Sequence, residues 1–190
     1  LDRVRVIGRA VALGAEISGV DLSGPLADGV VAAIRQALVE HQVIFFRDQD
    51  LTQAQHIAFA RQFGELEIHP ATPRDQPNRE VLRIAHGPDS RGRENNWHSD
   101  VTWRECPSLG SILRAIEIPP VGGDTLFADM YAAYDGLSDE IKAKIEGAYA
   151  LHDFAHFRKI MAKQGKTPEE IEAFNKLYPM MEHPVVRTHP

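Results

Sequence analysis

The chain has 190 residues, of which 43% are hydrophobic and 25% are charged. These proportions are typical of a soluble globular protein, and the length predicts a single domain over residues 1–190. The formal net charge of −6 argues against a nucleic-acid partner, because general nucleic-acid binders usually carry a basic face. No apolar run of about 18 residues is present, so we expect no membrane association. The single cysteine, Cys106, excludes a disulfide within the chain, and with no signal-peptide pattern it favours a cytoplasmic location.

The first 46 residues contain signals for strands and one helix. Residues 3–22 alternate loosely between apolar and polar side chains and are interrupted by glycines, which predicts two short strands. Residues 25–42 carry an apolar stripe at helical spacing. Val43–Phe46 is a short apolar run that predicts a buried strand.

A second helix signal follows. Thr52 and Gln55 fit a capping box, so we expect a helix that begins there, runs through Phe63 and ends at Gly64. Residues 65–79 contain several prolines and predict a loop.

The second half of the chain predicts further strands and three helices. Short apolar runs predict strands at residues 81–84, 111–116, 125–127 and 185–187. Helices are expected around 130–136, from a Ser138 cap to Glu146, and from a Thr167 cap that is followed by a proline and glutamates. Short strands, frequent turns and few helices, without a regular βαβ alternation, predict a mainly β fold with helical decoration.

The stretch from Asn95 to Trp103 contains the strongest functional signal. His98 and Asp100 are two residues apart, so in an extended segment both side chains point to the same face. One imidazole and one carboxylate make up two-thirds of the facial triad that holds non-haem Fe(II). The alternative is a surface histidine followed by a turn-forming aspartate.

The other histidines are weaker candidates. His69 lies in the proline-rich loop, where loops commonly meet ligands. His183 and His189 each suit a third metal ligand by residue type alone, and no spacing rule selects either one.

Several runs in the chain resemble the taurine dioxygenase family, whose relatives include the 2,4-dichlorophenoxyacetate dioxygenases and the alkylsulfatase dioxygenases. The resemblance keeps the same order over essentially the whole chain. The runs that carry it are His41–Gln49, Phe63–Leu66, Trp97–Asp100, Gly122–Thr125 and His183–Pro190.

This resemblance implies a double-stranded β-helix, or jelly roll, which this chain would leave incomplete at its C-terminal end. It also implies an enzyme that uses Fe(II), 2-oxoglutarate and O2. In that reaction 2-oxoglutarate becomes succinate and CO2 while a C–H bond of the substrate is hydroxylated. Hydroxylation beside a sulfonate then releases sulfite and an aldehyde.

The resemblance also assigns roles to individual residues. His98 and Asp100 correspond to two of the three iron ligands. Thr125 corresponds to the threonine that helps to hold the 2-oxoglutarate carboxylate. His69 corresponds to a histidine that contacts the sulfonate, and Val101 borders the substrate.

Two departures from the family pattern bear on this assignment. The third iron ligand and the arginines for 2-oxoglutarate and substrate lie beyond Pro190 in the family. Thr72 stands where taurine dioxygenase has a tyrosine, and Glu94 stands where it has an asparagine. A carboxylate near a sulfonate is repulsive, so the exact substrate stays open.

The sequence therefore predicts a dioxygenase that acts on a small anionic organic molecule, with a sulfonate such as taurine as the expected substrate. The alternatives are the same chemistry on an aryloxyalkanoate or an alkyl sulfate, and a non-catalytic ligand-binding relative if the protein ends at Pro190. We also expect a homo-oligomer.

Overall fold

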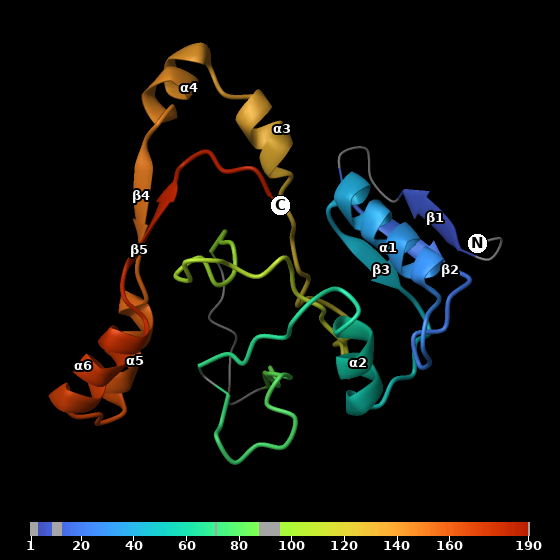
Figure 1. Ribbon diagram of the computed structural model, residues 1–190, viewed down its shortest axis with the longest axis horizontal. Helices are drawn as coiled ribbons and strands as arrows, with labels where there is room; N and C mark the ends of the chain where they lie inside the picture. The colour runs from blue at the N-terminus through green and yellow to red at the C-terminus, as the bar shows by residue number, and fades with distance from the viewer. Residues whose placement is uncertain (1–3, 9–12, 71, 88–95, 190) are drawn as a thin grey trace. The chain divides into compact units, whose positions relative to one another are not determined.

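The computed structural model describes residues 4–8, 13–70, 72–87 and 96–189. The chain divides into two compact units (Figure 1). The first comprises Leu1–Arg91 and Ile112–Gly136, and the second comprises Gly92–Ser111 and Leu137–Pro190.

The first unit contains a three-stranded sheet with a helix between its second and third strands. The strands are β1 (Arg5–Gly8), β2 (Ala15–Ser18) and β3 (Ile44–Phe46), and the helix is α1 (Asp28–His41). β1 is antiparallel to β2, and β2 is parallel to β3. The two strands predicted within residues 3–22 and the helix predicted within residues 25–42 are confirmed.

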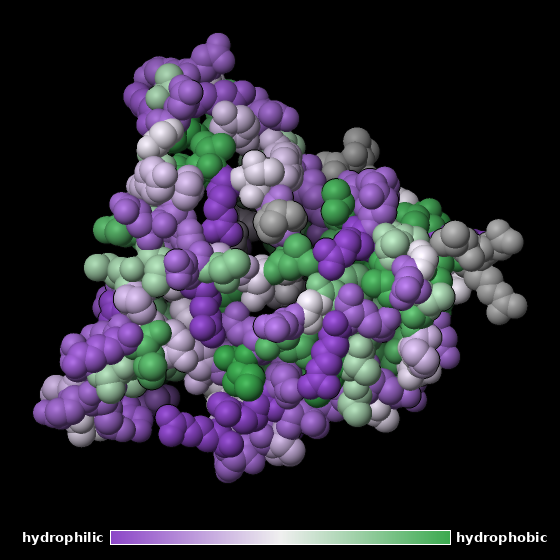
Figure 2. Space-filling model, viewed as in Figure 1, coloured by the Kyte–Doolittle hydropathy of each residue, from purple (hydrophilic) through white to green (hydrophobic). Residues whose placement is uncertain are grey.

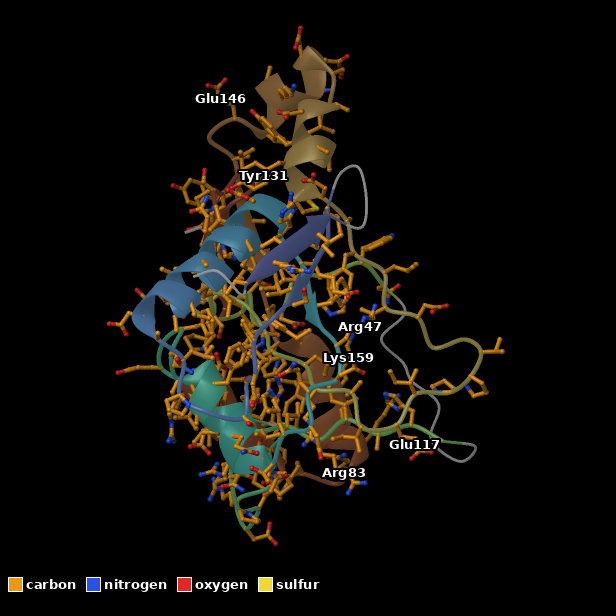
Figure 3. All side chains as sticks on the ribbon, turned by 90° about the vertical axis from the view of Figure 1, so that its right-hand side faces the viewer. Arg47, Arg83, Glu117, Tyr131, Glu146 and Lys159 are labelled. Atoms are coloured by element: carbon orange, nitrogen blue, oxygen red, sulfur yellow. The ribbon has the colours of Figure 1, made fainter. Side chains whose placement is uncertain are left out.

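The two neighbouring strands β2 and β3 differ in burial. In β2 the side chains of Ala15 and Ile17 are 0% and 2% exposed, as expected for one buried face of a strand. β3 lies at the edge of the sheet, and Phe45 is 38% exposed. Arg47, which follows β3 (Figure 3), pairs with Glu16 at 3.3 Å. The prediction of a strand at Val43–Phe46 is confirmed, but the prediction that it is buried is wrong because an edge strand has a neighbour on one side only.

The core of the first unit forms between α1 and residues that precede and follow it in the chain. Its buried members are Leu22, Ile34, Leu51 and Phe59. The ring of Phe59 contacts the edges of two other phenylalanine rings, those of Phe46 and Phe63, at centroid distances of 5.9 and 5.2 Å.

The helix α2 (Gln53–Ala60) begins at the predicted capping box. The Thr52 side chain accepts a hydrogen bond from the Gln55 amide, and the Gln55 side chain accepts one from the Thr52 amide at 2.7 Å. The helix ends at Ala60 rather than at Phe63, because the amides of residues 62 and 63 donate to carbonyls three residues back instead of four, the 3₁₀ pattern that is common at helix ends.

Three predicted strands in the middle of the chain are wrong, since residues 81–84, 111–116 and 125–127 join neither sheet. Their apolar side chains include Leu113, Ile116 and Leu126, which are 76%, 78% and 71% exposed. Figure 2 accordingly shows apolar residues scattered among hydrophilic ones on the face in view. An apolar run identifies a segment suited to a strand, but a strand also needs a neighbouring strand to bond its backbone N–H and C=O groups. Among the described residues, no strand pairs with these three segments.

The first unit ends in α3 (Met130–Asp135), and the second unit continues with α4 (Asp139–Ile145). The Ser138 side chain accepts a hydrogen bond from the Ile141 amide. Both helix predictions, around 130–136 and from the Ser138 cap, are therefore confirmed.

The second unit also has a two-stranded sheet and a helix pair. β4 (Tyr149–His152) is antiparallel to β5 (Met181–Pro184), and α5 (Ala155–Lys163) and α6 (Pro168–Leu177) lie between them in sequence. The capping box predicted at Thr167 is confirmed. The strand predicted at 185–187 is wrong in position, since β5 ends at Pro184 and only Val185 continues the bonding, to the Ala148 carbonyl at 2.9 Å.

In the part of the chain that the structure describes, five strands form two small sheets and more residues lie in helices than in strands. A complete jelly roll is not shown. None of the described helices combines the length and the apolar character needed to cross a lipid bilayer.

Candidate functional site

The structure brings His98 and Asp100 together in the second unit. His98 Nε2 lies 3.3 Å from Asp100 Oδ1, and the two side chains are 56% and 64% exposed. The backbone is not the extended strand that was expected, because a turn begins at Asp100 and the Arg104 amide donates to the Val101 carbonyl at 3.0 Å. The predicted pairing of the two side chains is present on a turn instead.

The hydrogen bonding of His98 selects one form of its ring. Nδ1 lies 2.8 Å from the Asn96 carbonyl oxygen, and a carbonyl only accepts hydrogen bonds. Nδ1 therefore carries a hydrogen. In the neutral ring this leaves the lone pair on Nε2, the atom that faces Asp100. Metal-binding histidines commonly use one nitrogen in this way while the other donates to a carbonyl.

The spacing of the two donor atoms suits a divalent ion. Bonds of about 2.1 Å that meet at about a right angle place two ligand atoms about 3 Å apart. The observed 3.3 Å between Nε2 and Oδ1 is close to that separation. Imidazole nitrogen with carboxylate oxygen is also a donor set that Fe(II) accepts.

Ser111 contacts the other oxygen of the same carboxylate. Its hydroxyl lies 3.3 Å from Asp100 Oδ2 and donates to it, which leaves Oδ1 directed at His98. Hydrogen bonds of this kind orient the ligands of metal sites. Sequence reasoning missed Ser111, because a serine eleven residues downstream gives no local signal.

A third ligand does not join the pair in the described parts of the chain, where no three His, Cys, Asp or Glu side chains are placed to hold one ion. His183 is not available for that role. Its Nε2 lies 2.8 Å from the Arg104 carbonyl, and its Nδ1 lies 3.2 Å from an Arg187 nitrogen. Both ring nitrogens are therefore used within the protein.

The turn that follows Asp100 has an unusual backbone. Val101 has a φ of 48°, in the left-handed region that β-branched residues rarely adopt. Such a conformation costs on the order of 1–3 kcal/mol and persists where surrounding contacts determine it.

Aromatic packing anchors the turn at Trp103, which is 9% exposed. Its ring stacks on Phe154 at 4.5 Å with an interplanar angle of 8°, and it meets the ring of Tyr178 edge-on at 5.1 Å. The Arg104 guanidinium lies 4.6 Å from the centre of the Trp103 ring. The partners come from the start of α5 and the end of α6, so the helix pair packs against the turn that carries the His98–Asp100 pair.

An ion pair fixes the chain at the start of α5. Asp153 pairs with Arg158, and both side chains are about three-quarters buried. The hydrogen bond from the Arg158 guanidinium is the main reason why the pKa of Asp153 lies below its ordinary value. The ion pair thereby restrains Asp153, which directly precedes Phe154 in the chain.

Of the other predicted site residues, His69 and Thr125 lie in the first unit, whereas Val101 and His189 lie in the second. His69 is half-buried and begins a turn in which its carbonyl accepts from the Thr72 amide at 2.9 Å. Thr72 is 4% exposed, and its hydroxyl has no hydrogen-bond partner among the described residues. Thr125 is exposed and lies outside regular structure. The roles of His69, Thr125 and Val101 stay predictions, and Glu94 lies outside the described residues.

Comparison with known proteins gives consistent results over the whole chain. Residues 4–190 match the model of the family described as "Taurine catabolism dioxygenase TauD, TfdA family". An alpha-ketoglutarate-dependent sulfate ester dioxygenase of Pseudomonas putida is 37% identical over 100% of the chain and 63% of its own length. An alkylsulfatase of Acinetobacter baylyi is 37% identical over 94% of the chain and 57% of its own length.

A solved structure extends this similarity to three dimensions. The crystal structure of a taurine dioxygenase from Burkholderia xenovorans matches with a TM-score of 0.76 and 37% identity, over 99% of this chain and 60% of that one. The chain thus spans between 57% and 63% of the length of these proteins. The family model, the relatives and the matching structure together place the chain in the taurine catabolism dioxygenase TauD, TfdA family.

Proposed function

We propose that this protein is a dioxygenase dependent on Fe(II) and 2-oxoglutarate that oxidises a small anionic organic substrate. The observation that carries the proposal is the His98–Asp100 pair, whose Nε2 and Oδ1 atoms are 3.3 Å apart. Members of the same family that match the chain are named as alpha-ketoglutarate-dependent dioxygenases.

His98 and Asp100 would hold the iron from one side. One neutral imidazole and one carboxylate leave coordination positions for a chelating oxo-acid and for O2. The bound iron would supply the oxidation of a C–H bond, coupled to the conversion of 2-oxoglutarate into succinate and CO2. The Asn96 carbonyl and the Ser111 hydroxyl would keep the two ligand side chains in their orientations.

Three further residues have proposed contacts. The Thr125 hydroxyl would donate a hydrogen bond to a carboxylate of 2-oxoglutarate. His69 would donate to the anionic group of the substrate, and Val101 would border the substrate beside the metal pair. The family resemblance supports these assignments.

For the substrate we propose a molecule that ends in a sulfo group, as a sulfonate or an alkyl sulfate. The names of the matching proteins support this class, since one acts on sulfate esters, one is an alkylsulfatase and one is a taurine dioxygenase. Thr72 and Glu94 depart from the taurine pattern, so we do not propose taurine itself over other sulfo compounds. An aryloxyalkanoate is the alternative substrate, since other matching proteins are named as dioxygenases of phenoxypropionate and 2,4-dichlorophenoxyacetate.

The first experiment tests the iron site. The full-length protein is titrated anaerobically with Fe(II) and 2-oxoglutarate, and the visible charge-transfer band of the chelate is recorded. We expect the band in the wild type, its loss in His98→Ala, and its retention in the control His86→Ala, which removes an exposed histidine of the first unit. A folded wild-type protein without the band would refute the dioxygenase proposal and favour a ligand-binding relative.

The second experiment tests the substrate class. Succinate formation is measured with a panel of alkyl sulfonates, alkyl sulfates and aryloxyalkanoates, with 2-oxoglutarate alone as the baseline. We expect sulfo compounds to stimulate succinate release most. If only aryloxyalkanoates stimulate it, the sulfo-group proposal fails while the dioxygenase proposal stands.

A further inference from the structure

His183, in the run His183–Pro190 that the proposed function does not use, is a buried polar residue of the second unit. It lies in β5 and is 7% exposed. Its Nε2 lies 2.8 Å from the Arg104 carbonyl, a residue 79 positions earlier in the chain. The contact therefore joins β5 to the turn that follows the His98–Asp100 pair.

The two hydrogen bonds of His183 fit one tautomer. The Arg187 guanidinium only donates, so Nδ1 accepts from it at 3.2 Å. Nε2 then carries the hydrogen and donates to the Arg104 carbonyl. Arg187 in this way selects the form of the ring that binds the turn.

The turn itself needs contacts from outside. Val101 occupies the left-handed region at a φ of 48°, directly after Asp100, and a valine does not prefer that conformation. Arg104 is the last residue of that turn: its amide donates to the Val101 carbonyl at 3.0 Å, and its own carbonyl accepts from His183. A bond to that carbonyl restrains the backbone four residues from the carboxylate of the pair.

We propose that His183 is a positioning residue for the His98–Asp100 pair. It acts through the Arg104 carbonyl, holds the turn from Val101 to Arg104, and so keeps Asp100 at the distance from His98 that metal binding requires. The link to metal rests on the proposed function, whereas the link to the turn does not.

A matched set of variants separates the hydrogen bond from simple packing. His183→Gln keeps a donor close to the position of Nε2, whereas His183→Leu keeps an apolar side chain of similar bulk and removes the donor. Arg187→Met removes the donor to Nδ1 at an exposed residue, and it serves as a second test if the leucine variant does not fold. His152→Gln is the control, because its ring lies 5.1 Å from that of His183 on the adjacent strand.

The experiment uses the full-length protein and two readouts. Amide hydrogen exchange of peptides within residues 97–105 reports the turn without any metal. Mn(II) binding, followed by electron paramagnetic resonance, reports the metal pair without turnover. We expect His183→Leu to speed exchange in this segment at least threefold and to weaken Mn(II) binding by about three- to tenfold. This is less than the roughly 10–100-fold effect of partners that bond to a metal ligand directly, because His183 acts through the backbone of the turn. Arg187→Met should change both readouts in the same direction, and His183→Gln and His152→Gln should stay within twofold of the wild type.

Two results would overturn the inference. One is a folded His183→Leu protein whose hydrogen exchange and Mn(II) affinity equal those of the wild type. If the leucine variant does not fold, the same result in a folded Arg187→Met protein overturns the inference. The other is equal loss in the glutamine and leucine variants, which would make packing rather than the hydrogen bond the cause. If Mn(II) binding is unaffected by His98→Ala, the proposed function fails instead, and the exchange data still decide whether His183 holds the turn.

Discussion

Trp103 offers the sharpest test of how the turn beside the His98–Asp100 pair is held. Replacing it with leucine keeps an apolar side chain but removes the indole ring. The variant would lose three contacts of the ring: the stack on Phe154 at 4.5 Å, the edge contact with Tyr178 at 5.1 Å and the contact with the Arg104 guanidinium at 4.6 Å.

The expected loss follows from these three contacts. An aromatic pair contributes about 0.5–1.5 kcal/mol beyond burial, and a cation over a ring at a partly exposed site contributes about 0.5–1 kcal/mol. Because neighbouring contacts do not add fully, we expect Trp103→Leu to lower the free energy of unfolding by about 2–3 kcal/mol.

Urea denaturation followed by far-ultraviolet circular dichroism measures this change. Trp97→Leu is the matched control, since Trp97 is 70% exposed and exposed positions usually change stability by less than about 0.5 kcal/mol. If Trp103→Leu were no more destabilising than Trp97→Leu, the aromatic anchoring of the turn would be refuted.

Two further predictions concern local features of each unit. Thr52→Ala should lower the free energy of unfolding by about 1 kcal/mol because it removes the capping box of α2, while Thr52→Ser should preserve it; equal urea midpoints for the two variants would contradict this. Asp153→Asn should destabilise the protein at pH 7. The hydrogen bond from Arg158 lowers the pKa of Asp153 below its ordinary value of 3.8, so this stabilisation is complete above 3.8 and is lost as pH falls through the lower folded-state pKa. Urea unfolding of wild type and variant should therefore differ at neutral pH and converge in strong acid, and a gap that does not change with pH would exclude this cause.

The features that sequence alone determined are those set by residues close together in the chain. The capping boxes at Thr52 and Thr167 were predictable because their partners lie three residues away. The pairing of His98 with Asp100 was predictable for the same reason, since residues two apart remain within reach in several backbone conformations.

The tertiary structure decided the contacts that join distant parts of the chain. The apolar run at 111–116 is typical of a strand, but the formation of a sheet also requires a second strand, which the run itself does not specify. The contact of His183 with Arg104 spans 79 residues, and Trp103 meets Phe154, which lies about fifty residues later in the chain. Such contacts form only when the chain folds back on itself, so a single sequence shows the side chains that make them but not the partners that they find.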